Sequence, residues 1–252
     1  MLMFLFGIGM FGSTFLLPLY LQNSLGYTAL QSGAVFLPVG IIQGFISPIS
    51  GWFSDKVNPK VPILTGMGLL VLSFYINSNL SFLTEHSYIM TSLYLRGLGM
   101  GLVFTPLSTL SLLTIPREKM AQASGISNTV RQVGGSMGVA LLSTILTARV
   151  NFHSQMFGGS IQSGSQEFQG VARHMAYYIQ QHGGGSFATA LRQAQSLVMS
   201  NVGSQAFIEG INDDFLIAAI ISLIGFLPIL MLKSKKNKMK SMDAEQHAHV
   251  ME

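Results

Sequence analysis

Residues 124–146 read SGISNTVRQVGGSMGVALLSTIL and combine a long apolar run with a polar beginning. This stretch is long enough to cross a lipid bilayer, which takes about 20 mostly apolar residues, yet its first half contains Asn128, Arg131 and Gln132. In a soluble helix these side chains would face water. The composition indicates lipid instead, because 49% of the 252 residues are hydrophobic and only 10% are charged, whereas about a quarter are charged in an average globular domain.

Long apolar runs recur along the chain and predict an all-α integral membrane protein with six transmembrane helices. They lie at about 3–22, 33–53, 61–79, 88–113, 124–148 and 214–232, and none contains an acidic residue away from its edges. The chain has no cysteine, and the histidines lie outside the runs without ligand spacing to acids. We therefore expect no metal site, no cofactor and no enzyme.

Basic residues favour one side of the membrane. The connections after the second and fourth runs and the tail at 233–252 hold nine of the fourteen Lys and Arg residues. Because short basic loops stay in the cytoplasm, we expect the tail there and the first helix running outward. The long connection at 149–213 is then extracytoplasmic. Helical spacing predicts two amphipathic helices in it, on the outer membrane face or the bundle end, with a partner-binding surface as the alternative.

Two arginines lie inside predicted spans, Arg96 and Arg131. A charge at the bilayer centre costs about 2.5–3.5 kcal/mol on insertion scales, so such residues usually face the bundle interior. The spans supply no acid to pair with either arginine. Each one then satisfies backbone carbonyls or snorkels, or else faces a water-filled cavity or a partner outside this chain. We take Arg131, Asn128, Gln132 and Arg96 as candidates for a polar path or cavity.

Glycines accompany these arginines at helical spacing. One helix face carries the polar residues and continues outward through glycines, at positions i, i+4, i+7, i+11 and i+14: Ser124, Asn128, Arg131, Gly135 and Gly138. Small residues four apart let two helices approach closely in a membrane. We therefore predict close helix crossings at two pairs, Gly97 with Gly101 and Gly134 with Gly138.

Several segments resemble one transporter family. The loop GWFSDKVNPK (51–60) is similar to the G-x-x-x-D-(R/K) motif of the major facilitator superfamily, although Asn58, Pro59 and Lys60 depart from its basic ending. Three longer segments resemble the fourteen-helix drug:proton antiporter branch, the EmrB/QacA type. They are LPLYLQNSLGYTALQSGAVFLPVGI (17–41), RGLGMGLVFTPL (96–107) and ASGISNTVRQVGGSMGVALL (123–142).

The resemblance covers almost the whole chain but only the C-terminal half of the family's proteins. It implies one six-helix bundle in the lipid of a bacterial inner membrane, and proton-driven export of hydrophobic or amphipathic drug-like compounds by alternating access. Asp55 and Lys56 would form the cytoplasmic gate loop, Arg131 would line the inner face, and Arg96 would face the interior. The implied partners are the missing N-terminal half and, in double-membraned bacteria, a periplasmic adaptor protein, but no nucleic acid.

One bundle cannot rock against itself. We therefore expect a fragment or half-transporter that is inactive alone. The alternative is a non-transporting membrane protein, structural or regulatory, that retains the bundle.

Overall fold

In the computed structural model of the chain, the described residues are 2–56, 58–112, 115–160, 165–183 and 186–225. They fold almost entirely into helices. In chain order these are α1 (Leu2–Gly12), α2 (Leu16–Asn23), α3 (Ala29–Val35), α4 (Leu37–Lys56), α5 (Lys60–Asn77), α6 (His86–Leu112), the 3-10 turn η1 (Arg117–Lys119), α7 (Met120–Ser160), α8 (Gln166–Gly183) and α9 (Phe187–Ile224).

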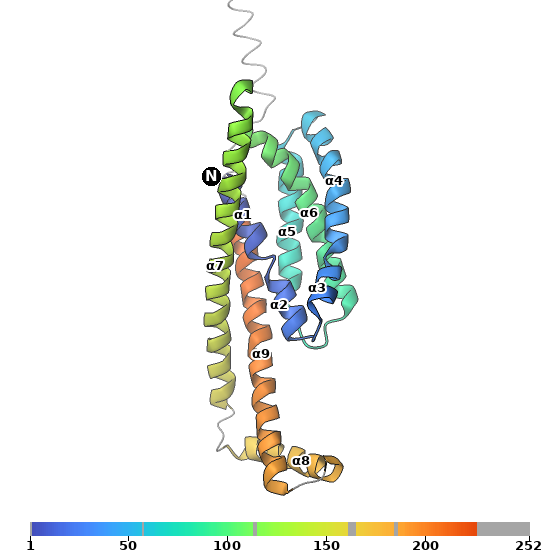
Figure 1. The fold of residues 1–252 in the computed structure, drawn as a ribbon, viewed down its shortest axis with the longest axis vertical. Helices are drawn as coiled ribbons and strands as arrows, with labels where there is room; N and C mark the ends of the chain where they lie inside the picture. Colours follow the sequence, from blue (N-terminus) through green and yellow to red (C-terminus); the bar gives the residue numbers. More distant parts are fainter. Residues whose placement is uncertain (1, 57, 113–114, 161–164, 184–185, 226–252) are drawn as a thin grey trace, which may run out of the picture.

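The long helices form two groups that pack against each other (Figure 1). In one group α6 packs between α4 and α5, and in the other α7 packs against both α1 and α9. The contact of α5 with α9 joins the two groups, and the apolar core lies there, with Phe74 and Phe215 fully buried. We call the end with Lys56 and Lys119 the basic end, and the opposite end, beyond which α8 projects, the α8 end.

Large apolar side chains also cover the outside of the bundle. On α4, Leu37, Ile41, Phe45 and Ile49 follow each other four residues apart, and all are exposed. Residues four apart share one helix face, so this face of α4 is a continuous apolar stripe. Such a stripe is expected where lipid, rather than water, is the solvent.

Four helical segments are long and apolar enough to cross a membrane: Met3–Asn23, Ala29–Ser54, Lys60–Asn77 and Met120–Gly159. They match four of the six predicted runs. Helix α6 carries Arg96 and many hydroxyl side chains, which lower its hydropathy. The last predicted run, 214–232, is described only to residue 225, and the predicted tail at 233–252 lies outside the described residues.

The first predicted span is broken in the middle. Helix α1 ends at Gly12, and α2 begins at Leu16. Between them, the Ser13 hydroxyl donates to the Gly9 carbonyl over 2.7 Å, and the Thr14 hydroxyl donates to the Met10 carbonyl over 2.6 Å. These local bonds give the carbonyls of α1 a partner other than the next helical N–H. They stabilise the break from within.

The predicted loop at 149–213 is largely helical and differs from the expectation in one respect. Helix α7 continues to Ser160, and α8 is a separate amphipathic helix, as its spacing predicts. The second predicted amphipathic helix is instead the beginning of α9, which runs unbroken to Ile224. Ser186 caps it by accepting from the Thr189 N–H, and no proline interrupts it. Isolated glycines such as Gly203 cost only about 1 kcal/mol in a helix, so α9 continues through them.

Helices α1 and α7 cross with their backbones in contact. A Cβ atom added at Gly138 would lie 2.5 Å from the Ile8 carbonyl oxygen, and one at Gly134 would collide with the Phe4 carbonyl. Both glycines therefore lie where only a hydrogen fits. The other predicted pair packs α6 against α4: a Cβ at Gly97 would lie 3.1 Å from the Val39 carbonyl oxygen, and one at Gly101 would lie 2.8 Å from the Ile46 Cβ.

Candidate functional site

The polar half of α7 faces a cavity of about 350 Å³ at the basic end. Its walls come from three helices that are distant in sequence. Met3 lies on α1, α6 contributes its last turns, and α7 contributes its first turns. The lining residues are Met3, Phe104, Ser108, Ser111, Leu112, Ser124, Gly125, Ser127, Asn128 and Arg131. We call this space the Arg131 cavity, because Arg131 carries the one formal charge among these described lining residues.

The guanidinium of Arg131 has two partners among the described residues. It lies over the Phe104 ring, with Cζ 4.7 Å from the ring centroid, and its Nη2 donates to Asn128 Oδ1. A cation over an aromatic face is stabilised by the ring quadrupole. The Nε–H group is buried and has no hydrogen-bond partner among the described residues. Because Arg131 lines the cavity together with four serines, the cavity contains one positively charged group and several hydroxyl groups.

Gln132 was predicted for the same polar path, whereas Asp55 and Lys56 were predicted for the cytoplasmic gate loop. Gln132 follows Arg131, about 100° further round the helix, and is exposed and absent from the cavity lining. Asp55 and Lys56 are the last two residues of α4. The Lys56 ammonium lies 4.4 Å from the centre of the Trp52 ring, on its own helix. The structure therefore brings Asn128 and Arg131 together, and Gln132 and Lys56 do not line their cavity.

Arg96 is buried in the bundle, with 2% of its surface exposed. Its Nη2 atom donates to Thr14 Oγ1 over 2.6 Å, and lies 3.3 Å from both Ser13 Oγ and the Met10 carbonyl oxygen. The guanidinium also lies over Phe74, at 5.5 Å. Arg96 therefore occupies the break between α1 and α2. Of the alternatives open from sequence, the described contacts favour the one in which Arg96 satisfies groups of the bundle itself.

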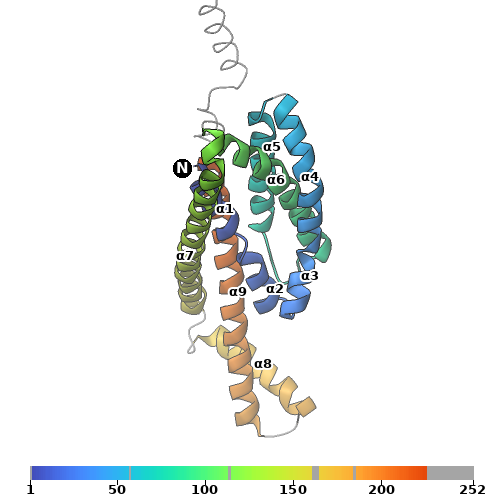
Figure 2. The ribbon, with the colours of Figure 1, turned by 45° about the horizontal axis from the view of Figure 1, so that its top comes forward.

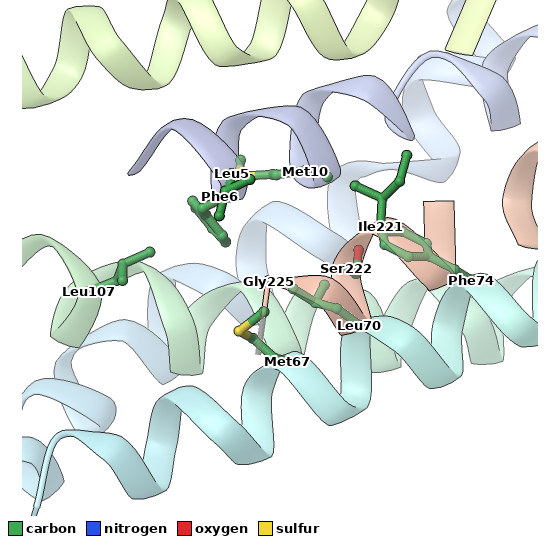
Figure 3. A pocket seen from close by; sticks show the side chains of 11 residues that line it. Leu5, Phe6, Met10, Met67, Leu70, Phe74, Leu107, Ile221, Ser222 and Gly225 are labelled. Carbon is green, nitrogen blue, oxygen red and sulfur yellow. The ribbon is translucent and has the colours of Figure 1, made fainter. Parts of the chain in front are cut away.

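A second cavity lies in the middle of the bundle, between α1, α5, α6 and α9 (Figure 3). Its volume is about 30 Å³, and its lining is apolar except for Ser222. A space of this size holds about one water molecule. It is too small for a drug-sized ligand, which needs roughly 300 Å³ or more. The Arg131 cavity is therefore the better candidate for binding.

Acidic residues near the α8 end were not among the predicted site residues. On α9, the Asp213 carboxylate lies 2.8 Å from His153 Nε2 and 3.6 Å from Arg149 Nε, both on α7. Its neighbour Asp214 is completely buried, and neither carboxylate oxygen has a hydrogen-bond partner among the described residues. Asp214 stands at the edge of the last apolar run, where sequence reading treats an acid as interfacial.

The part of the chain from α1 to the first half of α7, which includes the three walls of the Arg131 cavity, also carries the family signature. Residues 1–139, more than half of the chain, match the family profile described as Major Facilitator Superfamily. The chain belongs to the Major Facilitator Superfamily. This major facilitator chain is accordingly an all-α, multi-pass membrane protein, and its superfamily consists of transporters.

Curated relatives of the major facilitator chain include exporters. It is 30% identical over 240 residues to the uncharacterized MFS-type transporter YhcA of Bacillus subtilis, covering 95% of this chain and 45% of the relative. It is 29% identical to the multidrug export protein EmrB of Escherichia coli (85% and 40% covered). It is 28% identical to the fatty acid resistance protein FarB of Neisseria gonorrhoeae (88% and 42%). The chain spans less than half the length of these relatives.

Proposed function

We propose that this chain is the C-terminal bundle of a proton-coupled multidrug exporter, which moves hydrophobic or amphipathic toxic compounds out of the cytoplasm. The Arg131 cavity is the observation that carries the proposal. It combines a positively charged donor, hydroxyl groups and the aromatic face of Phe104. Such a mixed lining suits amphipathic molecules, which need apolar contact and a few placed polar groups. The relatives named for multidrug export and fatty acid resistance support the same assignment.

The membrane arrangement in this proposal follows the distribution of charge. The basic end lies in the cytoplasm of a bacterial cell with the tail, because short Lys- and Arg-containing loops stay inside. Helices α6 and α9 complete six spans with the four apolar segments. In this orientation the Arg131 cavity opens near the cytoplasmic side, from which substrates enter, and Asp55 and Lys56 belong to the cytoplasmic gate.

Transport in this proposal requires a second bundle. Alternating access is a rocking of one bundle against another around a shared site, so the chain exports nothing alone and works with an N-terminal bundle. The exposed apolar side chains of α4 and α7 can face either lipid or that bundle. At the other end, α8 and the projecting parts of α7 and α9 are where a periplasmic adaptor protein would bind.

The test is drug susceptibility in a bacterial host lacking its own exporters. The chain is expressed alone, with an N-terminal bundle from a relative, and with that bundle and Arg131→Ala. The challenge panel contains cationic dyes, acidic uncouplers and a long-chain fatty acid. We expect a several-fold rise in resistance only when both bundles are present, and its loss with Arg131→Ala. Unchanged resistance to the whole panel with both bundles present would favour the non-transporting alternative.

A further inference from the structure

Asp214 and Asn77 are two buried polar side chains without partners among the described residues. Both are completely buried, and neither the carboxylate oxygens of Asp214 nor the amide atoms of Asn77 make a hydrogen bond there. Buried polar groups in native proteins are almost always paired. An ionised carboxylate without a partner is costlier still, because removing its charge from water costs several kcal/mol. Two such residues in one bundle therefore call for a functional explanation.

The packing of α5 against α9 places these two residues at one depth. The Met67 Cε methyl on α5 lies against Gly225, at the end of α9. Near the other end of α5, the Asn212 side chain bonds both the N–H and the carbonyl of Leu80 over 2.9 and 3.0 Å. The two helices are antiparallel, so these contacts fix their register. Asn77 then lies at the level of Asp214 and Phe215.

The two residues also lie on the faces that point into the bundle. Asn77 continues the stripe of Leu70 and Phe74 on α5, which borders the small central cavity. Asp214 lies seven residues, or about two turns, before Ile221, which borders the same cavity from α9. Figure 3 shows Phe74 and Ile221 among the side chains that line this cavity. Asp214 and Asn77 therefore belong to one interior layer, closer to the α8 end than the cavity.

We propose that Asp214 is a proton-binding site of this bundle, with Asn77 as the second polar group of the site, open in part of the transport cycle to the α8 end. A proton from water adds to one carboxylate oxygen and makes the side chain neutral. It later leaves from that oxygen to water, and the charge returns. In the buried state shown by the structure, the neutral carboxyl is the form that the apolar surroundings accommodate.

The charged groups around Asp214 leave it without a counter-ion. Helices α1, α2, α5, α7 and α8 pack against α9. Among their described side chains, Arg149 and His153 on α7 both contact the carboxylate of Asp213. The hydroxyl of Tyr20, on α2, donates a hydrogen bond to the Ser81 carbonyl. The remaining described ionisable side chains on these elements lie on α8, on the exposed side of α5 or toward the basic end: Lys60, Tyr75, Arg131, Arg173, His174, Tyr177, Tyr178 and His182.

Proton binding is tested by infrared spectroscopy on the whole chain in lipid nanodiscs, where a protonated carboxyl gives a resolved carbonyl stretching band. We expect such a band at neutral pH, complete loss of it in Asp214→Asn, and its retention in Asp213→Asn, the matched control on the next residue. We also expect the band to shift in D2O, because an exchangeable proton is replaced. Asp214→Glu keeps a band at a changed frequency and shows that the fold tolerates substitution.

Two results would overturn the proposal. One is an identical carboxyl spectrum in the wild type and in Asp214→Asn. The other is a band that never shifts in D2O at any pH, which would mark a sealed structural carboxyl. The coupling role rests on the proposed function, whereas proton binding by the chain does not. With both bundles in vesicles, substrate-driven proton flux should fall at least about tenfold in Asp214→Asn, equivalent to about 1.4 kcal/mol. Unchanged flux would remove the coupling role.

Discussion

The Nη2 atom of Arg96 on α6 lies 2.6 Å from the Thr14 hydroxyl, across 82 residues of sequence. Thr14 in turn donates to the Met10 carbonyl. The buried charge of Arg96 thus has its best partner in the break between α1 and α2. The break and the arginine depend on each other, because the break exposes the acceptors and the arginine occupies them.

Thr14→Val should therefore destabilise the chain. The substitution keeps the side-chain shape but removes the closest acceptor of a buried cation, and hydrogen bonds to charged groups contribute about 1.5–3 kcal/mol. The double variant Thr14→Val/Arg96→Met should recover part of this loss, since no buried charge remains unpaired. Thermal unfolding in detergent measures both. The matched control is Thr144→Val on α7, where the exposed hydroxyl bonds only its own helix. Equal effects at positions 14 and 144 would contradict the interpretation.

Adding one methyl group at two glycines should have opposite effects. Gly138→Ala places a Cβ against the Ile8 carbonyl oxygen, and such overpacking costs about 1–3 kcal/mol. Gly170→Ala on α8 meets no atom within 4 Å, and should stabilise the chain by about 0.5–1 kcal/mol through helix propensity. Unfolding midpoints of the two variants decide the point, and a stabilised Gly138→Ala would mean that α1 and α7 lie further apart than described.

Asn212→Ala should loosen the turn after α5. The amide of Asn212 bonds both backbone groups of Leu80, so its removal leaves a buried N–H and a buried carbonyl unpaired, at about 1–3 kcal/mol each. Hydrogen exchange at residues 78–85 should then accelerate by at least about tenfold, which corresponds to 1.4 kcal/mol. Asn201→Ala, an exposed asparagine on the same helix, provides the control and should leave this exchange unchanged.

Arg131→Ala should lower export more than it lowers stability. The guanidinium lines a cavity, and its removal breaks only the hydrogen bond to Asn128 and the contact with the Phe104 ring. In the two-bundle transporter we expect a fall in transport of roughly tenfold or more, about 1.4 kcal/mol, with Arg131→Lys intermediate because it keeps charge but not the planar fork. Export that survives both substitutions would make Arg131 dispensable. Arg192→Ala, on an exposed position of α9, controls for loss of charge.

The sequence indicates the class of this fold because lipid demands long apolar helices, and their periodicity reveals the polar face of α7. Asn128 and Arg131 meet in one cavity because residues three apart share that face. Three features of the structure could not be predicted from the sequence. The α1–α2 break depends on Arg96, which is remote in sequence. The continuity of α9 depends on glycines that permit a turn without requiring one. Asp214 looks interfacial until the packing of α5 fixes its depth.

Helix α9 is one rod of 38 residues, about 57 Å long. Its first turns carry Ala190 and Ala194, which pack against α8, and its last turns reach the central cavity through Ser222. Figure 2 shows α8 standing clear of the bundle at the far end of this rod. One continuous helix therefore connects α8 to the central cavity. In the proposed orientation, a molecule that binds α8 from outside the cell would bind beside the same helix that lines the central cavity.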